Sequence, residues 1–525
     1  MDFEEHIQIE QPEHLLFLPP FKINSDLLLT AQEKADALAA QFECALQNPL
    51  ADVLPAFTQK VNDEIESFIA APIPSNEIFT EPSITRIKSI IRKLKNTKAP
   101  GKDKICNSLI KKLPPLAIKY IHSIISLCMR NSYFPNQWKH AEVIAIHKPG
   151  KDPSTPASYR PISLLSSISK ILERVVLERI NDHLDDNNIL PKQQFGFRPK
   201  FSTVHQLNRI VKQVKSKLKT KESTGMLLMD VEKAFDRVWH NGLIYKMMKY
   251  NFPHRIIKFI YSFLNNRKFH VQVIGKKSQT KIINFGVAQG AVLSPTLYNI
   301  YTSDIPKQLN NAELALFADD TAIFSSSRFS SIIINSLKSS MTRLHRYFLK
   351  WKIKLNTSKT EAIFFTRRRT RELPGSTITI GNETISWKTE AKYLGMIFDK
   401  TMTLNKHVDY AIAKSNKIAQ ILFPLINRSS NLDHWNKMMV YKQIIRPALT
   451  YGCPLFHHIA PTNIKKMQVF QNKILKMILD LPTFTSTSHI HEVTEMPFIK
   501  EYSTKLNETF NNRLHFYNDL FPDVP

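Results

Sequence analysis

The sequence predicts an α+β fold in which antiparallel hairpins and separate helices follow one another along the chain. Two apolar runs, 314–317 and 321–324, flank an Ala-Asp-Asp turn at 318–320 and predict a strand-turn-strand hairpin with both acids at its tip. Another short apolar run, 225–229, ends at Asp230 and predicts a strand. Hairpins mixed with separate helices favour α+β over a doubly wound parallel sheet.

The other expected elements follow from apolar periodicity and from capping residues. A helix is expected at about 25–45 and a proline-rich linker at 71–82, and Ser83 can cap the helix that follows. The remaining expectations, in chain order, are a strand at 141–147, a helix after Leu165, a helix after Asp236, a hairpin near 268–283, a helix at about 294–303 and a helical C-terminal region from 401 onward.

The charge of the chain is large and uneven. The 525 residues carry a formal net charge of +27. Residues 1–82 contain 15 acidic and 3 basic residues, a net of −12, so the rest of the chain carries +39. A basic excess of this size indicates a polyanionic partner, of which nucleic acid is the commonest. The acidic and basic parts are therefore expected to have different roles.

Cysteine usage and hydropathy indicate where the protein resides. The four cysteines have no paired spacing, so the sequence predicts an intracellular, reducing location, in the nucleus, the cytoplasm or both. The N-terminus lacks a basic-then-apolar signal pattern. No apolar run approaches the roughly 18 residues that a membrane span needs, so no membrane association is expected.

The expected arrangement of Asp230, Asp319 and Asp320 suits nucleotide transfer. That reaction needs a nucleophilic 3′-oxygen and a neutralised leaving pyrophosphate, and two divalent ions roughly 4 Å apart can do both. Mg²⁺ prefers carboxylate oxygens, with phosphate and water completing its shell. An Asp-Asp pair in a turn is ordinarily only solvated. The interpretation therefore depends on the combination of these acids with the motifs around them.

Seven motifs, in order, resemble those of reverse transcriptases from non-LTR retrotransposons, and most closely those of jockey-like elements. The segment 317–320, Phe-Ala-Asp-Asp, resembles the F/Y-x-D-D box, and 230–236 resembles the D-x-x-K-A-F-D motif of that branch. The other matching segments are 159–165, 194–198, 286–295, 354–360 and 393–395. The resemblance covers roughly 84–400 and implies a right-hand polymerase, with an acidic connector at 1–82, fingers and palm at 83–400, and a helical thumb and C-terminal region at 401–525.

The resemblance implies a role for each residue of the acidic motifs. Asp230 and Asp319 would hold two Mg²⁺ ions, for which Mn²⁺ could substitute, with the carbonyl of Val231 as a further ligand. Asp320 would support the site and bind metal less directly. Lys359 would donate a proton to the pyrophosphate, although an ordinary surface lysine is an equally open interpretation. The segment 393–395 would hold the primer end.

Other matching residues are implied in nucleotide binding. Phe235 would lie under the sugar and exclude a 2′-hydroxyl group, which would favour dNTP over NTP. Lys148 and Arg160 would contact the triphosphate, because basic groups suit phosphate oxygens. Gln289 and Gly290 would line the nucleotide and template pocket. A core position for Phe235 and solvated surface positions for Lys148 and Arg160 remain the alternatives.

One departure and one absence qualify the resemblance. Ala288 stands where the family motif has proline, which would stiffen the loop, so altered efficiency at most is expected. The residues before the fingers are too few for the endonuclease that usually precedes this polymerase, which suggests a truncated element copy or a separate gene.

The sequence therefore predicts an RNA-directed DNA polymerase with an RNA template, a DNA or RNA primer and dNTPs as partners. One alternative is a catalytically silent retroelement relic that still binds nucleic acid. Another is a protein resembling intron maturases, which mainly assists RNA folding. Template and primer preference, processivity and oligomeric state are not predicted by the sequence.

Overall fold

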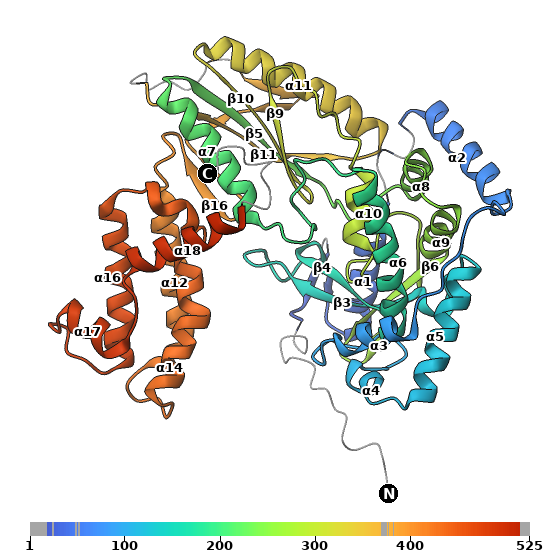
Figure 1. The fold of residues 1–525 in the computed structure, drawn as a ribbon, viewed down its shortest axis with the longest axis horizontal. Helices are drawn as coiled ribbons and strands as arrows, with labels where there is room; N and C mark the ends of the chain where they lie inside the picture. The colour runs from blue at the N-terminus through green and yellow to red at the C-terminus, as the bar shows by residue number, and fades with distance from the viewer. Residues whose placement is uncertain are drawn as a thin grey trace, which may run out of the picture. The chain divides into compact units, whose positions relative to one another are not determined.

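The computed structural model describes residues 18–514, except 24–25, 48–49, 51–52, 369–374, 376 and 382. The chain forms two compact units, each built from separate stretches of sequence (Figure 1). The first unit contains residues up to 191 together with 231–305 and 346–355, and the second contains 192–230, 306–345 and the residues from 356 onward.

The first unit combines one five-stranded sheet with helices. The order of the sheet is β4-β3-β6-β7, with β8 also paired to β6. Its strands are β3 (His140–His147), β4 (Tyr159–Leu164), β6 (Arg267–Val273), β7 (Lys276–Lys277) and β8 (Lys281–Ile283), and a separate hairpin contains β1 (Phe21–Ile23) and β2 (Asp26–Leu28). Its helices are α1 (Ala31–Ala45), α2 (Pro55–Ala70), α3 (Ile84–Arg92), α4 (Asn107–Lys111), α5 (Pro115–Arg130), α6 (Ser167–Asp186), α8 (His240–Lys249), α9 (His254–Leu264) and α10 (Ser294–Tyr301).

The second unit contains a five-stranded sheet and the helical C-terminal region. The order of this sheet is β14-β11-β5-β10-β9. Its strands are β5 (Ser223–Val231), β9 (Glu313–Phe317), β10 (Asp320–Ser327), β11 (Leu355–Phe365) and β14 (Trp387–Lys388), with hairpins formed by β12 (Ile378–Ile380) and β13 (Glu383–Ile385) and by β15 (Glu390–Tyr393) and β16 (Met396–Asp399). Its helices are α7 (Thr203–Lys219), most of α11 (Ser330–Lys350), α12 (Asn405–Ile421), α13 (Phe423–Ile426), α14 (His434–Val440), α15 (Arg446–Leu449), α16 (Pro461–Ile478), α17 (Thr487–Thr494) and α18 (Ile499–Leu514), with a π-helix at Tyr441–Ile445.

The side chains of β5 point alternately to the two faces of the second sheet, and this explains why helices cover both faces. Met226 and Leu228 belong to one buried cluster with the apolar side of α7. Gly225 faces the other way, where an added Cβ would lie 2.6 Å from the side chain of Ile333 on α11. Successive side chains of a strand point to opposite faces, so an apolar strand of this kind must be covered on both. The strand is consequently the buried centre of the unit.

The α+β class predicted from the sequence is confirmed, and so are most of its expected elements. The 313–327 hairpin, the strand that contains 225–229 and the helical C-terminal region are all present. The domain limits predicted from the resemblance, 1–82, 83–400 and 401–525, remain a prediction. Within the described part of the chain, no helix is both long and apolar enough to cross a membrane.

The helix expected at about 25–45 was wrong in its first residues. Residues 26–28 pair with 21–23 as a hairpin, and the helix α1 begins only at Ala31. Thr30 is its N-cap: the hydroxyl of Thr30 accepts the Glu33 N–H at 3.2 Å, and the Glu33 carboxylate accepts the Thr30 N–H at 2.9 Å. This reciprocal capping box fixes the start of the helix.

The described part of the acidic N-terminal segment, within residues 18–82, forms polar contacts with later residues of its own unit. Glu43 on α1 forms an ion pair with Lys281 at 2.8 Å. Glu64 on α2 forms one with Lys249 at 3.1 Å. The carboxylate of Glu77 accepts the backbone N–H of His254 at 2.8 Å, at the beginning of α9. Exposed ion pairs contribute little individually, so aromatic packing is expected to hold this segment more firmly.

Phe57 is the aromatic anchor of α2. Its ring makes edge contacts with Trp239, Tyr245 and Trp351, at centroid distances of 6.3, 6.2 and 5.6 Å. The ammonium group of Lys350 lies 4.8 Å from the centroid of the same ring. Aromatic pairs with this geometry stabilise beyond their buried area.

Replacing Phe57 with alanine is expected to loosen α2 from its unit. The half-buried ring loses three aromatic partners, so we expect a loss of roughly 1–3 kcal/mol of stability. Thermal unfolding, and the rate of limited proteolysis within the 71–82 segment, would measure this. Ile78→Ala is the matched control, because Ile78 lies in the same segment and is 90% exposed. Equal melting temperatures and equal proteolysis rates of the two variants would contradict the anchoring role of Phe57.

Candidate active site

Two adjacent strands place Asp230, Asp319 and Asp320 beside one another in the second unit. β5 and β10 are antiparallel, with Thr321 opposite Met229, so Asp230 and Asp320 occupy the same end of the strand pair. β10 also pairs with β9, with Asp320 opposite Phe317. Ala318 and Asp319 therefore form a tight two-residue turn, in which Ala318 has a φ of +57°. The hairpin expected from the sequence is confirmed, with Asp320 as the first residue of its second strand.

The carboxylates affect one another electrostatically. Burial raises the pKa of Asp319, and the neighbouring charge of Asp230 raises it further. Asp320 is exposed by its surface area, yet burial by the surrounding protein, together with Asp319 and Asp230, raises its pKa to about 6. Like charges this close disfavour ionisation unless a cation joins them. The cluster is thus a negatively charged site that suits a metal ion.

A hollow of about 380 Å³ adjoins the acids. Asp230, Asp320 and Lys359 line it, together with Tyr393 and Leu394 from the motif that the resemblance links to the primer. The ammonium group of Lys359 on β11 lies 3.2 Å from a carboxylate oxygen of Asp230. Of the residues expected from the acidic motifs, the structure therefore brings these together around one space.

The acids alone do not form a protein cage for a metal. Among the described residues, no group of three or more His, Cys, Asp or Glu side chains is arranged to hold an ion. Mg²⁺ is usually bound by one or two carboxylates, with substrate phosphates and water as further ligands. The raised pKa values of Asp319 and Asp320 fit that kind of open site, and so does their position beside Asp230 at one end of the strand pair.

The segment 194–198 holds the turn formed by Ala318 and Asp319 in place. The sequence alone did not predict this role. The side-chain oxygen of Gln194 accepts the N–H of Ala318 at 2.9 Å and that of Gly196 at 2.8 Å. Gln194 is 2% exposed. A Cβ on Gly196 would lie 2.1 Å from the nitrogen of Ala318. Glycine is consequently required where the two backbones touch.

In the first unit, the segment 286–295 is tied to the residues that follow Asp230 in the sequence. The N–H of Val287 donates to the carbonyl of Phe235 at 2.8 Å, and that of Gly286 to the carbonyl of Val238 at 2.8 Å. The side-chain nitrogen of Gln289 donates to the carboxylate of Asp236 at 2.6 Å. Burial raises the pKa of Asp236. Asp236 thereby fixes the orientation of the Gln289 side chain.

Further contacts hold the other side of this segment. The N–H of Ser163 donates to the carbonyl of Gln289 at 2.8 Å. The carboxylate of Glu173, which is fully buried, accepts the N–H of Val292 at 2.6 Å. A Cβ on Gly290 would lie 2.5 Å from the carbonyl oxygen of Ser163, so a side chain is excluded there. The backbone of the segment is therefore fixed from several directions.

Comparison with known proteins identifies the family. The pattern of the family described as "Reverse transcriptase (RNA-dependent DNA polymerase)" matches residues 146–398. Residues 146–398 are a reverse transcriptase domain. This range contains Asp230, Asp319 and Asp320, and it extends over both compact units.

Three relatives from insects are similar over most of the chain. "Probable RNA-directed DNA polymerase from transposon X-element" of Drosophila melanogaster is 36% identical over 82% of this chain and 47% of its own length. "Probable RNA-directed DNA polymerase from transposon BS" of the same species is 34% identical, over 88% and 51%. "RNA-directed DNA polymerase from mobile element jockey" of Drosophila funebris is 34% identical, over 92% and 53%. The chain spans about half the length of these relatives. The expected resemblance to jockey-like elements is confirmed.

The other residues expected to bind nucleotide belong to the first unit of the reverse transcriptase fold. Phe235 is half-buried and stacks on Tyr298, with ring centroids 5.1 Å apart. Arg160 is exposed on β4, opposite Ile146 of β3. The ammonium group of Lys148 donates to the carbonyl of Ala157 at 2.7 Å, so it already has a protein partner.

Val231, the further metal ligand that the resemblance implies, is the buried last residue of β5. Its role in metal binding stays a prediction, and so do the roles of Phe235, Arg160 and Lys148 in nucleotide binding.

Gly196→Ala is expected to displace the turn that carries Asp319. The added methyl group would clash with the backbone of Ala318, and overpacking of this kind costs roughly 1–3 kcal/mol. We expect a lower melting temperature and at least a tenfold loss of nucleotide incorporation. Gly375→Ala is the control, because a Cβ there would meet nothing within 4 Å. Full activity of Gly196→Ala would show that the contact does not position the acids.

Asp320→Asn is expected to stabilise the metal-free protein at neutral pH. Since the pKa of Asp320 is raised to about 6 in the folded protein, its ionisation opposes folding, and this cost is complete above that pH. This destabilisation is absent below the unfolded-state pKa of about 4 and grows as the pH rises toward 6. In EDTA, the variant should therefore melt at a higher temperature than the wild type at pH 7.5, and the difference should shrink toward pH 4.

Mg²⁺ should reduce this difference in melting temperature. The ion should raise the melting temperature of the wild type more than that of Asp320→Asn, because the variant has lost one negative charge from the site. Scanning calorimetry with and without Mg²⁺ would measure both effects. An identical response of both proteins to Mg²⁺ would argue against any metal contribution from Asp320.

Proposed function

We propose that this chain is an RNA-directed DNA polymerase, which adds dNTPs to the 3′-hydroxyl group of a primer paired with an RNA template. The observation that carries the proposal is the convergence of Asp230, Asp319 and Asp320 at one end of two paired strands, within a reverse transcriptase domain. The net charge of +27 suits a polyanionic template and primer. Its proposed location is intracellular, in the nucleus or the cytoplasm.

We propose that Asp230, Asp319 and Asp320 hold two Mg²⁺ ions, or Mn²⁺ in their place, with the carbonyl of Val231 as a further ligand. When bound, the ions would activate the 3′-oxygen and neutralise charge on the leaving pyrophosphate. Asp230 and Asp319 would bind them most directly, and Asp320 would contribute charge beside them. Two further observations support this: the raised pKa values of Asp319 and Asp320, and the hollow that the acids adjoin.

Lys359 is the proposed proton donor to the pyrophosphate. Its ammonium group lies 3.2 Å from Asp230, so it can contribute positive charge and a proton close to the acids. Tyr393 and Leu394 line the same hollow and are proposed to hold the primer end. Leu394 has a φ of +45°, and its carbonyl accepts the hydroxyl of Tyr451 at 2.6 Å, which fixes this turn.

Selection of the nucleotide is proposed to depend on residues of the first unit. The ring of Phe235, stacked on Tyr298, would exclude a 2′-hydroxyl group from the sugar position. Gln289, oriented by Asp236, and Gly290, with its exposed backbone, would line the nucleotide pocket. Arg160 and Lys148 would contact the triphosphate.

The decisive measurement is Mg²⁺-dependent dNTP incorporation on a primed RNA template, by the wild type and by Asp319→Ala. Incorporation by the wild type and a loss of at least a thousandfold in the variant are expected, because removing a metal ligand abolishes charge stabilisation in the transition state. Melting and nucleic-acid binding of the variant would show that it remains folded. A folded wild type that incorporates nothing with either Mg²⁺ or Mn²⁺ would instead favour a silent, nucleic-acid-binding relic.

A further inference from the structure

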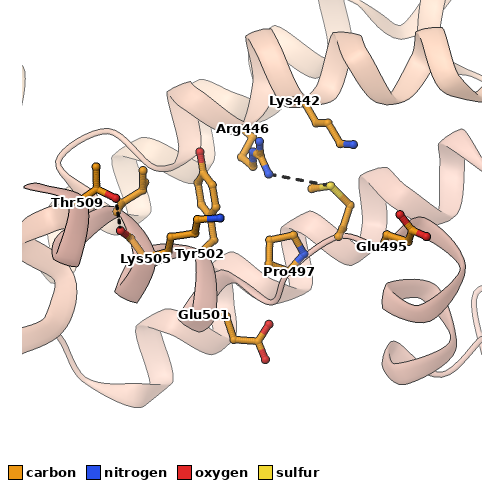
Figure 2. A pocket seen from close by; sticks show the side chains of 10 residues that line it. Lys442, Arg446, Glu495, Pro497, Glu501, Tyr502, Lys505 and Thr509 are labelled. Carbon is orange, nitrogen blue, oxygen red and sulfur yellow. Dashed lines mark hydrogen bonds between the residues drawn. The ribbon is translucent and has the colours of Figure 1, made fainter.

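A second hollow, of about 630 Å³, lies within the C-terminal helices and shares no residue with the acidic site. The π-helix Tyr441–Ile445, the start of α15 and the helix α18 contribute to its walls (Figure 2). Lys442, Arg446 and Lys505 supply positive charge, and Met496, Pro497, Tyr502 and Leu506 supply most of the apolar lining. π-Helical turns are rare and often lie at functional sites.

The basic groups of this hollow have no carboxylate partner among the described residues. Neither Lys442 nor Lys505 has a side-chain ion pair or hydrogen bond in that part of the chain. The guanidinium group of Arg446 lies 4.2 Å from the ring centroid of Tyr502. Its Nη1 atom contacts only the sulfur of Met496, at 4.0 Å, and its buried Nε atom has no hydrogen-bond partner. The guanidinium group thus makes no hydrogen bond to an oxygen atom within the described residues, and together with Lys442 and Lys505 it favours an anionic ligand with acceptor oxygens.

Two carboxylates, Glu495 and Glu501, also line the hollow, but among the described residues neither forms an ion pair with its three cations. The carboxylate of Glu501 accepts the N–H of Phe498 at 3.0 Å, which caps the beginning of α18. Figure 2 shows Glu501 pointing away from Arg446 and Lys505. Glu495, just after α17, is exposed.

The wall of the hollow is held in place before any ligand binds. The carbonyl of Met496 lies 2.6 Å from Nδ1 of His491, and the ring of His491 stacks on Phe498 with centroids 4.1 Å apart. The side-chain nitrogen of Gln471 donates to the carbonyl of Pro497 at 3.1 Å. Gln471 also accepts the hydroxyl of Tyr441 at 2.6 Å, from the π-helix. A preorganised wall reduces the entropy lost on binding.

We propose that this hollow binds a segment of single-stranded nucleic acid outside the catalytic acids, with Lys442, Arg446 and Lys505 on its phosphates. A base would pack on the apolar lining beside the stacked pair of Arg446 and Tyr502. Phosphate oxygens match ammonium and guanidinium donors, and aromatic and arginine planes accept bases of any sequence. An acidic protein segment would use the same positive charges and is therefore the competing ligand in the test, as an acidic peptide.

The test is equilibrium binding of a fluorescent single-stranded RNA, and of the same sequence as DNA, of about 15 nucleotides. Binding is measured by anisotropy over a range of salt concentrations, in EDTA. The double variant Lys442→Gln/Lys505→Gln is compared with the wild type and with Lys500→Gln, which lies exposed on α18 but does not line the hollow. Melting temperatures confirm that the variants are folded, and a 4-thiouridine in the RNA locates the contact by photocrosslinking.

The double variant should bind about tenfold more weakly, and the slope of log K against log salt should fall in magnitude by about 1.4, since each phosphate contact on a single strand contributes about 0.7. Lys500→Gln should match the wild type, and crosslinks should map to residues 442–446 or 495–509, which line the hollow. The proposal would be overturned if the double variant had the same affinity and salt slope as Lys500→Gln. It would also be overturned if every crosslink mapped to residues outside the hollow. Acidic-peptide binding with unaltered oligonucleotide binding would overturn it too.

This inference goes beyond the proposed function, and the two can fail separately. Because binding is measured without divalent metal, a chain that does not polymerise could still show the loss in the double variant. Conversely, an active polymerase whose RNA affinity is the same in the double variant and in Lys500→Gln would retain the proposed function and exclude this site.

Discussion

Holding three carboxylates together against their mutual repulsion is the constraint on which the rest of the candidate active site depends. Burial, and then the charges of Asp319 and Asp230, oppose the ionisation of Asp320 and raise its pKa to about 6. Flexible loops would relieve such repulsion by moving apart. Here Asp230 and Asp320 belong to paired strands and Asp319 to the turn before β10, and buried side chains on both faces of β5 prevent those strands from separating. The repulsion is therefore retained in the folded protein, where a cation can relieve it.

The turn between β9 and β10 needs a second constraint, because a hairpin alone leaves its tip free to move. Gln194 supplies it, since one buried oxygen accepts N–H groups from both Ala318 and Gly196. The close approach of Gly196 to the same turn leaves no room for a side chain. A segment more than a hundred residues earlier in the sequence thus determines where Asp319 lies. Positioning groups of this kind commonly matter as much as the residues that touch the substrate.

A similar argument applies to Ala288, which stands where the family motif has proline. Proline would restrict the backbone of a single residue. In this chain, the carbonyl of Ala288 accepts the hydroxyl of Ser294 at 2.8 Å, and hydrogen bonds from Val287, Gln289 and Val292 hold the residues around it. Those bonds fix the conformation of the segment without the ring. The loosening expected from the sequence is therefore offset by contacts that only the folded chain provides.

Local patterns were sufficient to predict the parts of the fold that depend on them. Apolar alternation predicted β5 and the β9–β10 hairpin, and Ser83 was correctly expected to cap α3. Long-range contacts were not predictable in this way. The pairing of residues 26–28 with 21–23 overrode the helix expected there, and the contacts of Phe57 with three aromatic residues join segments that are distant in sequence. The motif at 194–198 was recognised, but its contact with Ala318 has no local signal.

The motif at 230–236 shows most clearly what a linear sequence conceals. Its first residue, Asp230, belongs to the second unit, with Asp319, Asp320 and Lys359. Its last residues, Phe235 and Asp236, belong to the first unit, with Gln289 and Gly290. One contiguous motif therefore contributes to two separately packed groups of residues. Strand pairing fixes the group proposed to bind metal, whereas hydrogen bonds to the 286–295 segment fix the group proposed to select the nucleotide. Substitutions in the two groups should consequently have separable effects, on metal dependence in one case and on the choice between dNTP and NTP in the other.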